Sequence, residues 1–376
     1  MRCLACFVLT TAVFAQRTVD WEGRPGVVLE NDQLELITLT KGGAFVSLRL
    51  KSDAKKTNPM WDPIRMARET GGPSRFGESL GHFVCVDGFG PSSPEERKAG
   101  LEGHGEAHRQ VWERTGGGRQ GTAQTLEFKT TLPVVQETFR RKLSLVDGEQ
   151  VVYVDSELES LVGFDRPVNW AEHATIGAPF LAPGKTVVET SAAQCQTRPH
   201  VQQPPNRRLV SGRDFAYPLA PTIAGPLRDV RLVPNPPDSM DHTACAMDPN
   251  RALGWVTAFN TDSRMMIGYL FRREEYPWLQ EWLNFPSNGA LSRGLEFGTQ
   301  PYDVSRRDAV SRGTMFGVPT YRWLPAKGKI GSRFLMFWTV IPSGLTKVDD
   351  MRLEGGQVVI TGPGGVRLTL AASLGL

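Results

Sequence analysis

Short runs of alternating apolar and polar residues, separated by turn-forming glycine and proline, dominate this sequence and point to β-sheet. Such runs occupy residues 27–39 and 44–50, and a period of two indicates strands with one buried face. Residues 142–158 carry Asp147-Gly148 between two further runs, which predicts a hairpin because both residues tolerate positive φ. A second hairpin is expected near the C-terminus, with its turn at residues 362–365. Since no amphipathic helix exceeds two or three turns, we expect an all-β, mostly antiparallel fold.

The length of 376 residues and the many expected strands favour one large domain built from two packed sheets. Residues 194–238 are rich in proline, arginine and glutamine, and they fit either an interdomain linker or a long excursion within one sandwich. Strand-like segments of the same character on both sides favour the excursion. We therefore expect a single β-sandwich domain over residues 16–376.

The N-terminus has the pattern of a secretory signal peptide. One arginine precedes an apolar run at residues 3–15, and Val13 and Ala15 are the small residues expected before a cut ahead of Gln16. A buried first strand or an uncleaved membrane anchor would give a similar run, but this run is short for a bilayer span. We therefore expect residues 1–15 to be removed and the mature protein to be exported, to the periplasm or the extracellular space, with no membrane association.

The charge balance limits the classes of partner that the chain can bind, and the number of cysteines limits the disulfides that it can form. The 43 basic and 40 acidic residues give a formal net charge of +3, so we expect no field of one sign that would hold nucleic acid or an anionic membrane. A neutral or small ligand is favoured instead. After signal removal Cys85, Cys195 and Cys245 remain, without a metal-binding spacing, which allows at most one disulfide and one free thiol. The sequence leaves open which pair forms.

The stretch GHGEAHR places His104 and His108 four residues apart, close to the spacing of a helical zinc site. In such a site the base glutamate directly follows the first histidine, whereas here Gly105 follows and Glu106 is shifted by one place. The other histidines are scattered, so we expect neither a metal nor another cofactor. We expect His104, on a glycine-rich turn, to present its ring to a cleft, and His108 to be a solvated surface residue.

Two later segments carry a histidine and a glutamate in apolar surroundings. His173 follows Trp170, and it is either a core histidine bonded to a backbone carbonyl or part of a sugar site, since flat aromatic rings stack on pyranoses. Glu296 lies between Leu295 and Phe297, with glycines nearby that let the backbone pass close to a ligand. This glutamate is either half of a structural salt bridge or a base with a shifted pKa. Each residue alone leaves the choice open.

In their order and spacing, His104 followed by Trp112, His173 in EHATIGAPFL and Glu296 in GLEFGTQP resemble the aldose 1-epimerase, or galactose mutarotase, family. The resemblance covers most of the mature chain. It implies a β-supersandwich whose concave face binds a monosaccharide. It also implies that His173 is the general acid, that Glu296 is the general base, and that His104 orients the sugar and polarises its ring oxygen.

The same resemblance suggests a further sugar-binding residue. The sequence also differs from the family pattern at two places. Asp241, in DHTACAM, matches the family's Asp-His segment and would bond a sugar hydroxyl. The family commonly has asparagine where Glu172 stands. Its early Asn-Arg pair has no clear counterpart here, only Asn58 followed by Pro59, then Arg65 and Arg75. We expect Arg75 to contribute to sugar binding. Trp170 and Trp278 would supply stacking surfaces. We expect a divergent member that interconverts the anomers of a monosaccharide or oligosaccharide by acid–base ring opening.

Three other functions stay open. A non-catalytic carbohydrate-binding protein on the same scaffold would use these tryptophans together with Trp282. A polysaccharide lyase or glycoside hydrolase would suit such a sandwich, but a hydrolase usually needs two opposed carboxylates, and only Glu296 is evident. A phosphosugar epimerase would need an anion site, for which Arg65, Arg75 and Arg293 are candidates.

Overall fold

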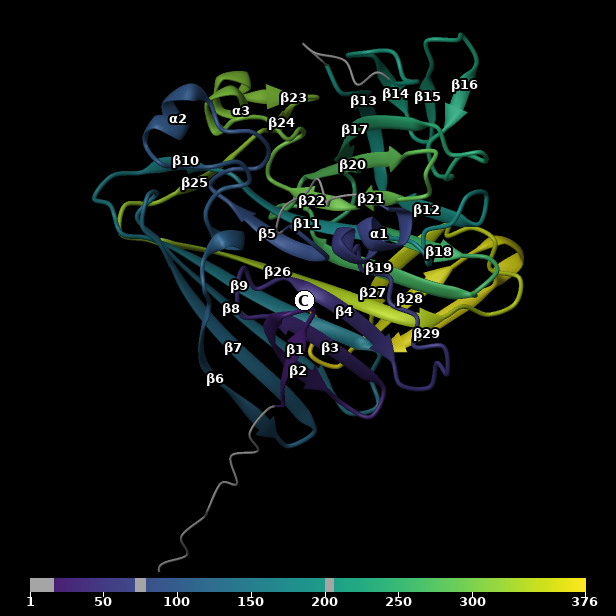
Figure 1. Cartoon of the computed structure of the whole chain (residues 1–376), viewed down its shortest axis with the longest axis horizontal. Coiled ribbons are helices and arrows are strands. Elements are labelled where there is room, and N and C mark those ends of the chain that lie inside the picture. The colour runs from purple at the N-terminus through teal and green to yellow at the C-terminus, as the bar shows by residue number, and fades with distance from the viewer. Residues whose placement is uncertain (1–16, 72–78, 200–205) are drawn as a thin grey trace, which may run out of the picture.

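A computed structural model describes residues 17–71, 79–199 and 206–376, so the expected signal peptide and Arg75 lie outside the described residues. Strands make up most of the chain, and all the paired strands are antiparallel (Figure 1). The helices of the described ranges are short, and none is long and apolar enough to cross a membrane. They are α1 (Pro63–Thr70), α2 (Pro94–Lys98), α3 (Arg306–Arg312) and the 3₁₀ turns η1 (Ala107–Arg109) and η2 (Pro363–Gly365).

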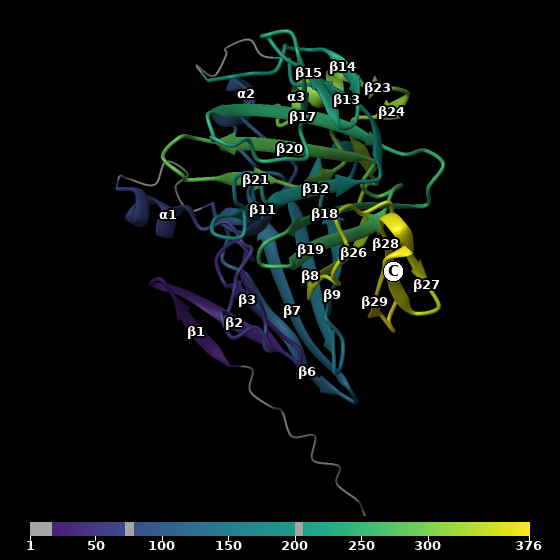
Figure 2. The same ribbon diagram turned by 90° about the vertical axis from the view of Figure 1, so that its right-hand side faces the viewer.

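The larger of the two main sheets has 12 strands. Their order is β1-β2-β3-β4-β5-β11-β21-β20-β17-β13-β14, and Figure 2 shows β11, β21, β20 and β17 side by side in this order. Strand β22 lies in line with β21 between β11 and β20 (Figure 1). The bounds are β1 (Thr18–Trp21), β2 (Arg24–Glu30), β3 (Leu34–Leu39), β4 (Phe45–Leu50), β5 (His82–Val86), β11 (Trp170–Gly177), β13 (Ala192–Thr197), β14 (Asp214–Ala216), β17 (Ser239–Met247), β20 (Trp278–Phe285), β21 (Ser292–Gly294) and β22 (Glu296–Gly298).

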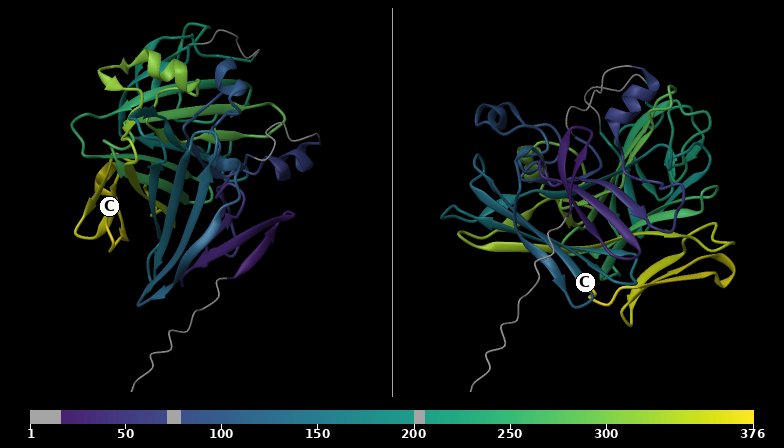
Figure 3. Two further views of the ribbon diagram at one scale, coloured as in Figure 1. Left: turned by 90° about the vertical axis from the view of Figure 1, so that its left-hand side faces the viewer. Right: turned by 60° about the horizontal axis from the view of Figure 1, so that its bottom comes forward.

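The second main sheet has eight strands in the order β12-β18-β19-β26-β9-β8-β7-β6 and packs on the first (Figure 3). Its strands are β6 (Glu113–Gln120), β7 (Ala123–Leu132), β8 (Glu137–Val146), β9 (Val151–Ser160), β12 (Thr186–Thr190), β18 (Leu253–Asn260), β19 (Met265–Arg272) and β26 (Lys329–Val340). Short sheets complete the fold: β10 (Arg166–Val168) with β25 (Arg322–Leu324), β15 (Leu219–Pro221) with β16 (Leu227–Asp229), β23 (Thr314–Met315) with β24 (Val318–Pro319), and β27 (Asp350–Glu354), β28 (Gln357–Thr361) and β29 (Arg367–Ala371).

The core lies between the two main sheets and explains the alternating sequence pattern. Side chains from both sheets form one buried cluster, to which β11 contributes Trp170 and Ile176 and β8 contributes Leu143. Because successive side chains of a strand point to opposite faces, His173 of β11 faces away from this core. The alternation therefore decides which residues of the larger sheet are available for a site on its other face.

The hairpin expected at Asp147-Gly148 is present between β8 and β9, and the C-terminal hairpin joins β28 to β29. The apolar run at residues 27–39 is two strands, because Asn31 forms a turn between them. Its Oδ1 accepts the N–H of Leu34 at 2.6 Å, and its Nδ2 donates to the carbonyl of Val146 at 2.6 Å. The turn thus also ties this edge of the larger sheet to the end of β8.

One disulfide, Cys195–Cys245, joins β13 to β17 at directly opposite positions, and Cys85 is a buried free thiol. This agrees with the limit of one bridge and one free cysteine set by the sequence. The proline-rich segment at residues 194–238 leaves the larger sheet after β13, adds β14 beside β13 at the edge of that sheet, and leads into β17, the other neighbour of β13. The bridge therefore closes the base of that excursion.

Candidate active site

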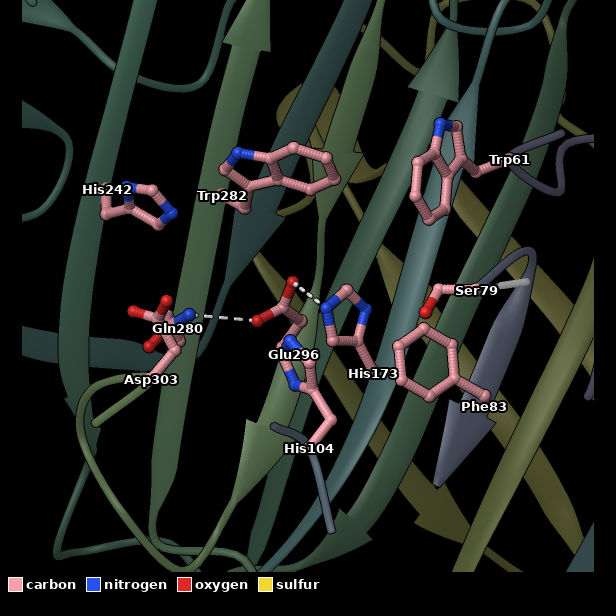
Figure 4. A pocket seen from close by; sticks show the side chains of 10 residues that line it. All are labelled: Trp61, Ser79, Phe83, His104, His173, His242, Gln280, Trp282, Glu296 and Asp303. Atoms are coloured by element: carbon pink, nitrogen blue, oxygen red, sulfur yellow. Dashed lines mark hydrogen bonds and ion pairs between the residues drawn. The ribbon is translucent and has the colours of Figure 1, made fainter. Parts of the chain in front are cut away.

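A cavity of about 350 Å³ opens on the face of the larger sheet that points away from the core (Figure 4). Strands β5, β11, β17, β20 and β22 each place a side chain in it, and loops complete its rim. Its lining residues are Trp61, Ser79, Phe83, His104, His173, His242, Gln280, Trp282, Glu296 and Asp303. The two histidines and the glutamate singled out by the sequence thus meet in one cavity.

His173 and Glu296 lie next to each other on the floor of this cavity. The Nε2 atom of His173 is 3.4 Å from Oε1 of Glu296. The side-chain amide of Gln280, directly opposite Glu296 on β20, donates to Oε2 of the glutamate at 3.0 Å. The amide fixes one carboxyl oxygen and leaves the other facing the histidine and the cavity, which is suitable geometry for a proton-transfer pair.

The surroundings shift the two pKa values in opposite directions. Burial raises the pKa of Glu296 well above its ordinary value, and the charge of Asp303 adds to the rise. Burial lowers the pKa of His173 well below its ordinary value, and the neighbouring imidazole of His104 adds to the fall. Both shifts oppose the normal preference of a proton for histidine over a carboxylate.

His104 stands on a strained turn that carries its ring into the cavity. Its φ is +63°, and Gly105, which follows, has a φ of +72°. A Cβ on residue 105 would lie 2.0 Å from the carbonyl oxygen of Val86, so only glycine fits there. The ring centroid of His104 lies 5.2 Å from that of His173. Residues other than glycine adopt left-handed backbone uncommonly, and histidine is among those that tolerate it best.

Aromatic rings form the walls. Phe83 is the direct cross-strand partner of His173 and stacks on its ring with centroids 4.3 Å apart. On the other side Trp282 is the cross-strand partner of His242, and Trp61 lies with its ring centroid 5.5 Å from that of Trp282. Flat apolar surfaces around polar groups suit a ring-shaped, hydroxyl-bearing ligand.

The expected role of Asp241 in sugar binding is corrected by the structure. Its carboxylate is buried and accepts the backbone N–H groups of Arg208 and Leu209, at 3.1 and 2.9 Å for Oδ1. The next residue, His242, lines the cavity instead. The two residues lie on opposite faces of β17 because side chains alternate along a strand, so the correct segment was assigned to the wrong face.

Trp170 and Trp278 are also not cavity residues. Trp170 points into the core between the sheets, where its Nε1–H donates to Glu172 at 3.2 Å. Trp278 lies on the same face of β20 as Gln280, but the segment around β23 and β24 covers it, and its Nε1–H donates to the carbonyl of Pro319 at 2.7 Å. The stacking surfaces come from other aromatic residues.

The described residues do not form the arginine cluster that was considered for an anion. Arg293 is buried in an ion pair with Glu281, and Arg65 pairs with Glu69. His108 is not a solvated surface residue, because its ring packs against Phe83 and burial lowers its pKa to about 3. In the described part of the chain no three histidine, cysteine or acidic side chains are grouped as they would be to hold a metal ion.

Several residues that line the cavity were not assigned to the catalytic site from the sequence. Gln280 could have been found from strand alternation, since it shares a face of β20 with Trp278. Trp282, which the sequence suggested for a carbohydrate-binding protein, lies on the same face and lines the cavity. Asp303 lies seven residues after Glu296, outside the stretch GLEFGTQP, and no pattern of its own marked it. Trp61 and Phe83 gave no signal, because their place in the cavity depends on which strands become neighbours.

Gly294 makes room for the glutamate, which gives a testable prediction. A Cβ on residue 294 would lie 2.1 Å from Oε1 of Glu296, so Gly294→Ala should push the carboxyl group away from His173. A misplacement of this order lowers the rate of an acid–base enzyme by roughly 10²-fold. Gly331→Ala is the matched control, because its nearest contact would be an ordinary 3.6 Å. Equal kcat/KM in the two folded variants would contradict the tight fit around Glu296.

Comparisons with known proteins show the fold. No family profile and no curated protein sequence matches the chain. Solved structures do match it. A galactose mutarotase-like protein from Clostridium acetobutylicum superimposes with a TM-score of 0.59 at 13% identity, over 88% of this chain and 99% of that one. A galactose mutarotase-like protein from Lactobacillus casei gives 0.54 at 14% identity, over 84% and 100%.

A galactose mutarotase related enzyme from Lactobacillus acidophilus gives a TM-score of 0.55 at 12% identity, over 84% of this chain and 97% of that one. The class of protein is therefore defined by its fold, the galactose mutarotase-like β-sandwich, as the resemblance implied. Identities this low place the chain as a divergent representative of that fold.

Proposed function

We propose that this chain is an aldose 1-epimerase-like mutarotase that interconverts the α and β anomers of an unphosphorylated sugar. The observation that carries the proposal is the contact of His173 with Glu296, 3.4 Å apart in a cavity with aromatic walls. Two proton-transfer groups from distant parts of the chain, on strands β11 and β22, meet where a pyranose would fit. The shared fold adds support, since the named structural neighbours carry mutarotase names.

The proposed reaction needs one proton shared by the pair. Glu296 accepts the proton of the anomeric hydroxyl, while His173 gives its proton to the ring oxygen. The bond from the anomeric carbon to the ring oxygen breaks and a free aldehyde forms. After rotation about the first carbon–carbon bond, the same transfers run in reverse and close the ring to the other anomer. Each side chain ends with the proton count it had at the start, so neither a redox reaction nor a covalent intermediate is required.

The opposed pKa shifts suit this reversible reaction. Burial makes protonated His173 a stronger acid and ionised Glu296 a stronger base than either would be in water. Both shifts therefore favour release of a proton by His173 and its uptake by Glu296 during ring opening.

The competing functions receive less support. Asp303 is a second carboxylate in the cavity, as a hydrolase would need, but it forms an ion pair with Arg198 at 2.7 Å. The arginines considered for a phosphosugar site are dispersed among other partners wherever they are described. A carbohydrate-binding protein would use the same walls, and the experiment below separates it from an enzyme.

We also propose that the mature protein works outside the cytoplasm. The chain has a disulfide, Cys195–Cys245. Disulfides form and persist in oxidising compartments and are rare in cytosolic proteins. This agrees with the signal-like N-terminus, which lies outside the described residues.

The function is tested by following the optical rotation of freshly dissolved α-glucose, α-galactose and α-xylose with the purified mature chain. Acceleration of mutarotation above the spontaneous rate for at least one sugar is the expected result. If calorimetry detects binding of an aldose but no bound aldose is converted faster, the chain is a carbohydrate-binding protein and not a mutarotase. Release of new reducing ends from a polysaccharide would favour a hydrolase or lyase.

The pH dependence provides a further prediction. The charge of Asp303 raises the pKa of Glu296, whereas Arg198 lowers it. Asp303→Asn removes the first influence and frees Arg198 from its partner, so the pKa of Glu296 should fall. Because the shared proton is then lost at lower pH, the alkaline limb of kcat/KM should move to lower pH, after correction for the spontaneous rate. A limb that stays in place or moves to higher pH would contradict the assignment.

A further inference from the structure

The ring of His104 is held from behind by its neighbours. Its Nδ1 accepts the backbone N–H of Gly90 at 3.3 Å and lies 3.6 Å from Sγ of Cys85. The backbone N–H of His104 donates in turn to the carbonyl of Gly90 at 2.9 Å. The ring therefore enters the cavity with its Nδ1 edge bound, and its far edge points toward the center of the site (Figure 4).

The partner of Nδ1 decides where the ring carries its proton. A backbone N–H can only donate, so the Nδ1 atom of His104 must offer its lone pair. A neutral imidazole that accepts at Nδ1 carries its hydrogen on Nε2. Cys85 is fully buried on β5, and burial raises the pKa of its thiol well above the ordinary value, so the thiol keeps its hydrogen. With its Sγ 3.6 Å from Nδ1, it is placed to donate to the same nitrogen.

His173, the adjacent imidazole, has a different kind of partner. Its Nδ1 lies 2.8 Å from Oγ1 of Thr175. A hydroxyl can donate or accept, so it satisfies Nδ1 whether or not that nitrogen carries a hydrogen. His173 can therefore bind and release a proton at Nε2, whereas protonation of His104 at Nδ1 would set two donors against each other.

We propose that Cys85 is a positioning residue which, with the backbone of Gly90, holds His104 in the tautomer protonated on Nε2. His104 is then a neutral hydrogen-bond donor to a sugar oxygen and takes no part in proton transfer. The tautomer itself follows from the geometry alone. Its kinetic consequence rests on the proposed mutarotase function.

The tautomer is tested on the unmodified protein by ¹⁵N NMR of histidine-labelled chain, with His104 assigned through His104→Gln. The expected spectrum at neutral pH has a pyrrole-type Nε2 and a pyridine-type Nδ1 for His104. A pyrrole-type Nδ1, or the two similar shifts of an imidazolium, would overturn the proposal. This measurement needs no sugar, so a failure of the proposed function leaves it intact.

The role of Cys85 is tested with Cys85→Ala and Cys85→Ser. Loss of a weak hydrogen bond to the ring predicts that Cys85→Ala lowers kcat by about three- to tenfold and broadens the His104 nitrogen signals. Cys85→Ser restores a donor and should return kcat to within about twofold of wild type. Wild-type kcat and sharp His104 signals in a folded Cys85→Ala variant would show that Cys85 does not position the ring.

Discussion

Replacement of Glu296 by glutamine is expected to lower kcat/KM for anomer interconversion by about 10²- to 10⁴-fold, the usual contribution of a placed proton-transfer group. The amide has nearly the same shape as the carboxyl group, so it can keep a hydrogen bond to Gln280, but it cannot take a proton from the anomeric hydroxyl. Affinity for the sugar should change little. Rates from polarimetry and affinities from calorimetry separate the two effects.

Glu274→Gln is the control for this substitution, since Glu274 is exposed and lies outside the cavity. It should leave both rate and affinity at wild-type levels. Full activity of Glu296→Gln would remove the glutamate from the chemistry. If circular dichroism shows that Glu296→Gln does not fold, Glu296 is required for the fold and not only for the reaction.

The second large effect is expected in the core directly below the site. Glu172 is next to His173 but on the opposite face of β11, and it is fully buried. Its Oε1 lies 2.6 Å from the guanidinium of Arg141, and its Oε2 lies 3.0 Å from Nε2 of His82. Burial alone would raise the pKa of Glu172, but these partners hold it below the ordinary value. Arg141→Met leaves this buried charge without its cation and should lower the free energy of unfolding by about 3–5 kcal/mol.

Arg140→Met is a control on the neighbouring residue. Arg140 pairs with Glu157 and Glu159 on the surface, where its side chain is 38% exposed, and such pairs contribute about 0–1 kcal/mol. Urea unfolding of both variants at neutral pH compares the two arginines directly. Equal losses would show that the ion pair between the sheets does not stabilise the fold.

The sequence could predict the strands and three of the site residues because both depend on local pattern or order. A period of two gave the β-fold, and the series His104, His173 and Glu296 fell on residues that converge in one cavity. The remaining sugar-binding predictions depended on which face of a strand is covered. A shift by one residue separates Asp241 from His242, and the segment around β23 and β24 hides Trp278.

Two of the wall residues, Phe83 and Trp61, could not be predicted from the sequence. Phe83 stacks on His173 because β5 pairs with β11, and these strands are far apart in the chain. Trp61 reaches the same cavity from the loop before α1. Strand pairing between distant segments is set by the packing of the whole sheet, so no local pattern marks either aromatic residue.

The central claim, that His173 and Glu296 act as one proton-transferring unit on a single sugar, is tested most directly by a double-mutant cycle. The measurement is kcat/KM for anomer exchange of the best aldose, by NMR exchange spectroscopy, in His173→Ala, Glu296→Gln and the double variant. Groups that act as a unit are strongly non-additive, so the double variant should be no more than about threefold slower than the slower single variant. Losses that multiply in the double variant would show two independent contributions and contradict the shared-proton mechanism.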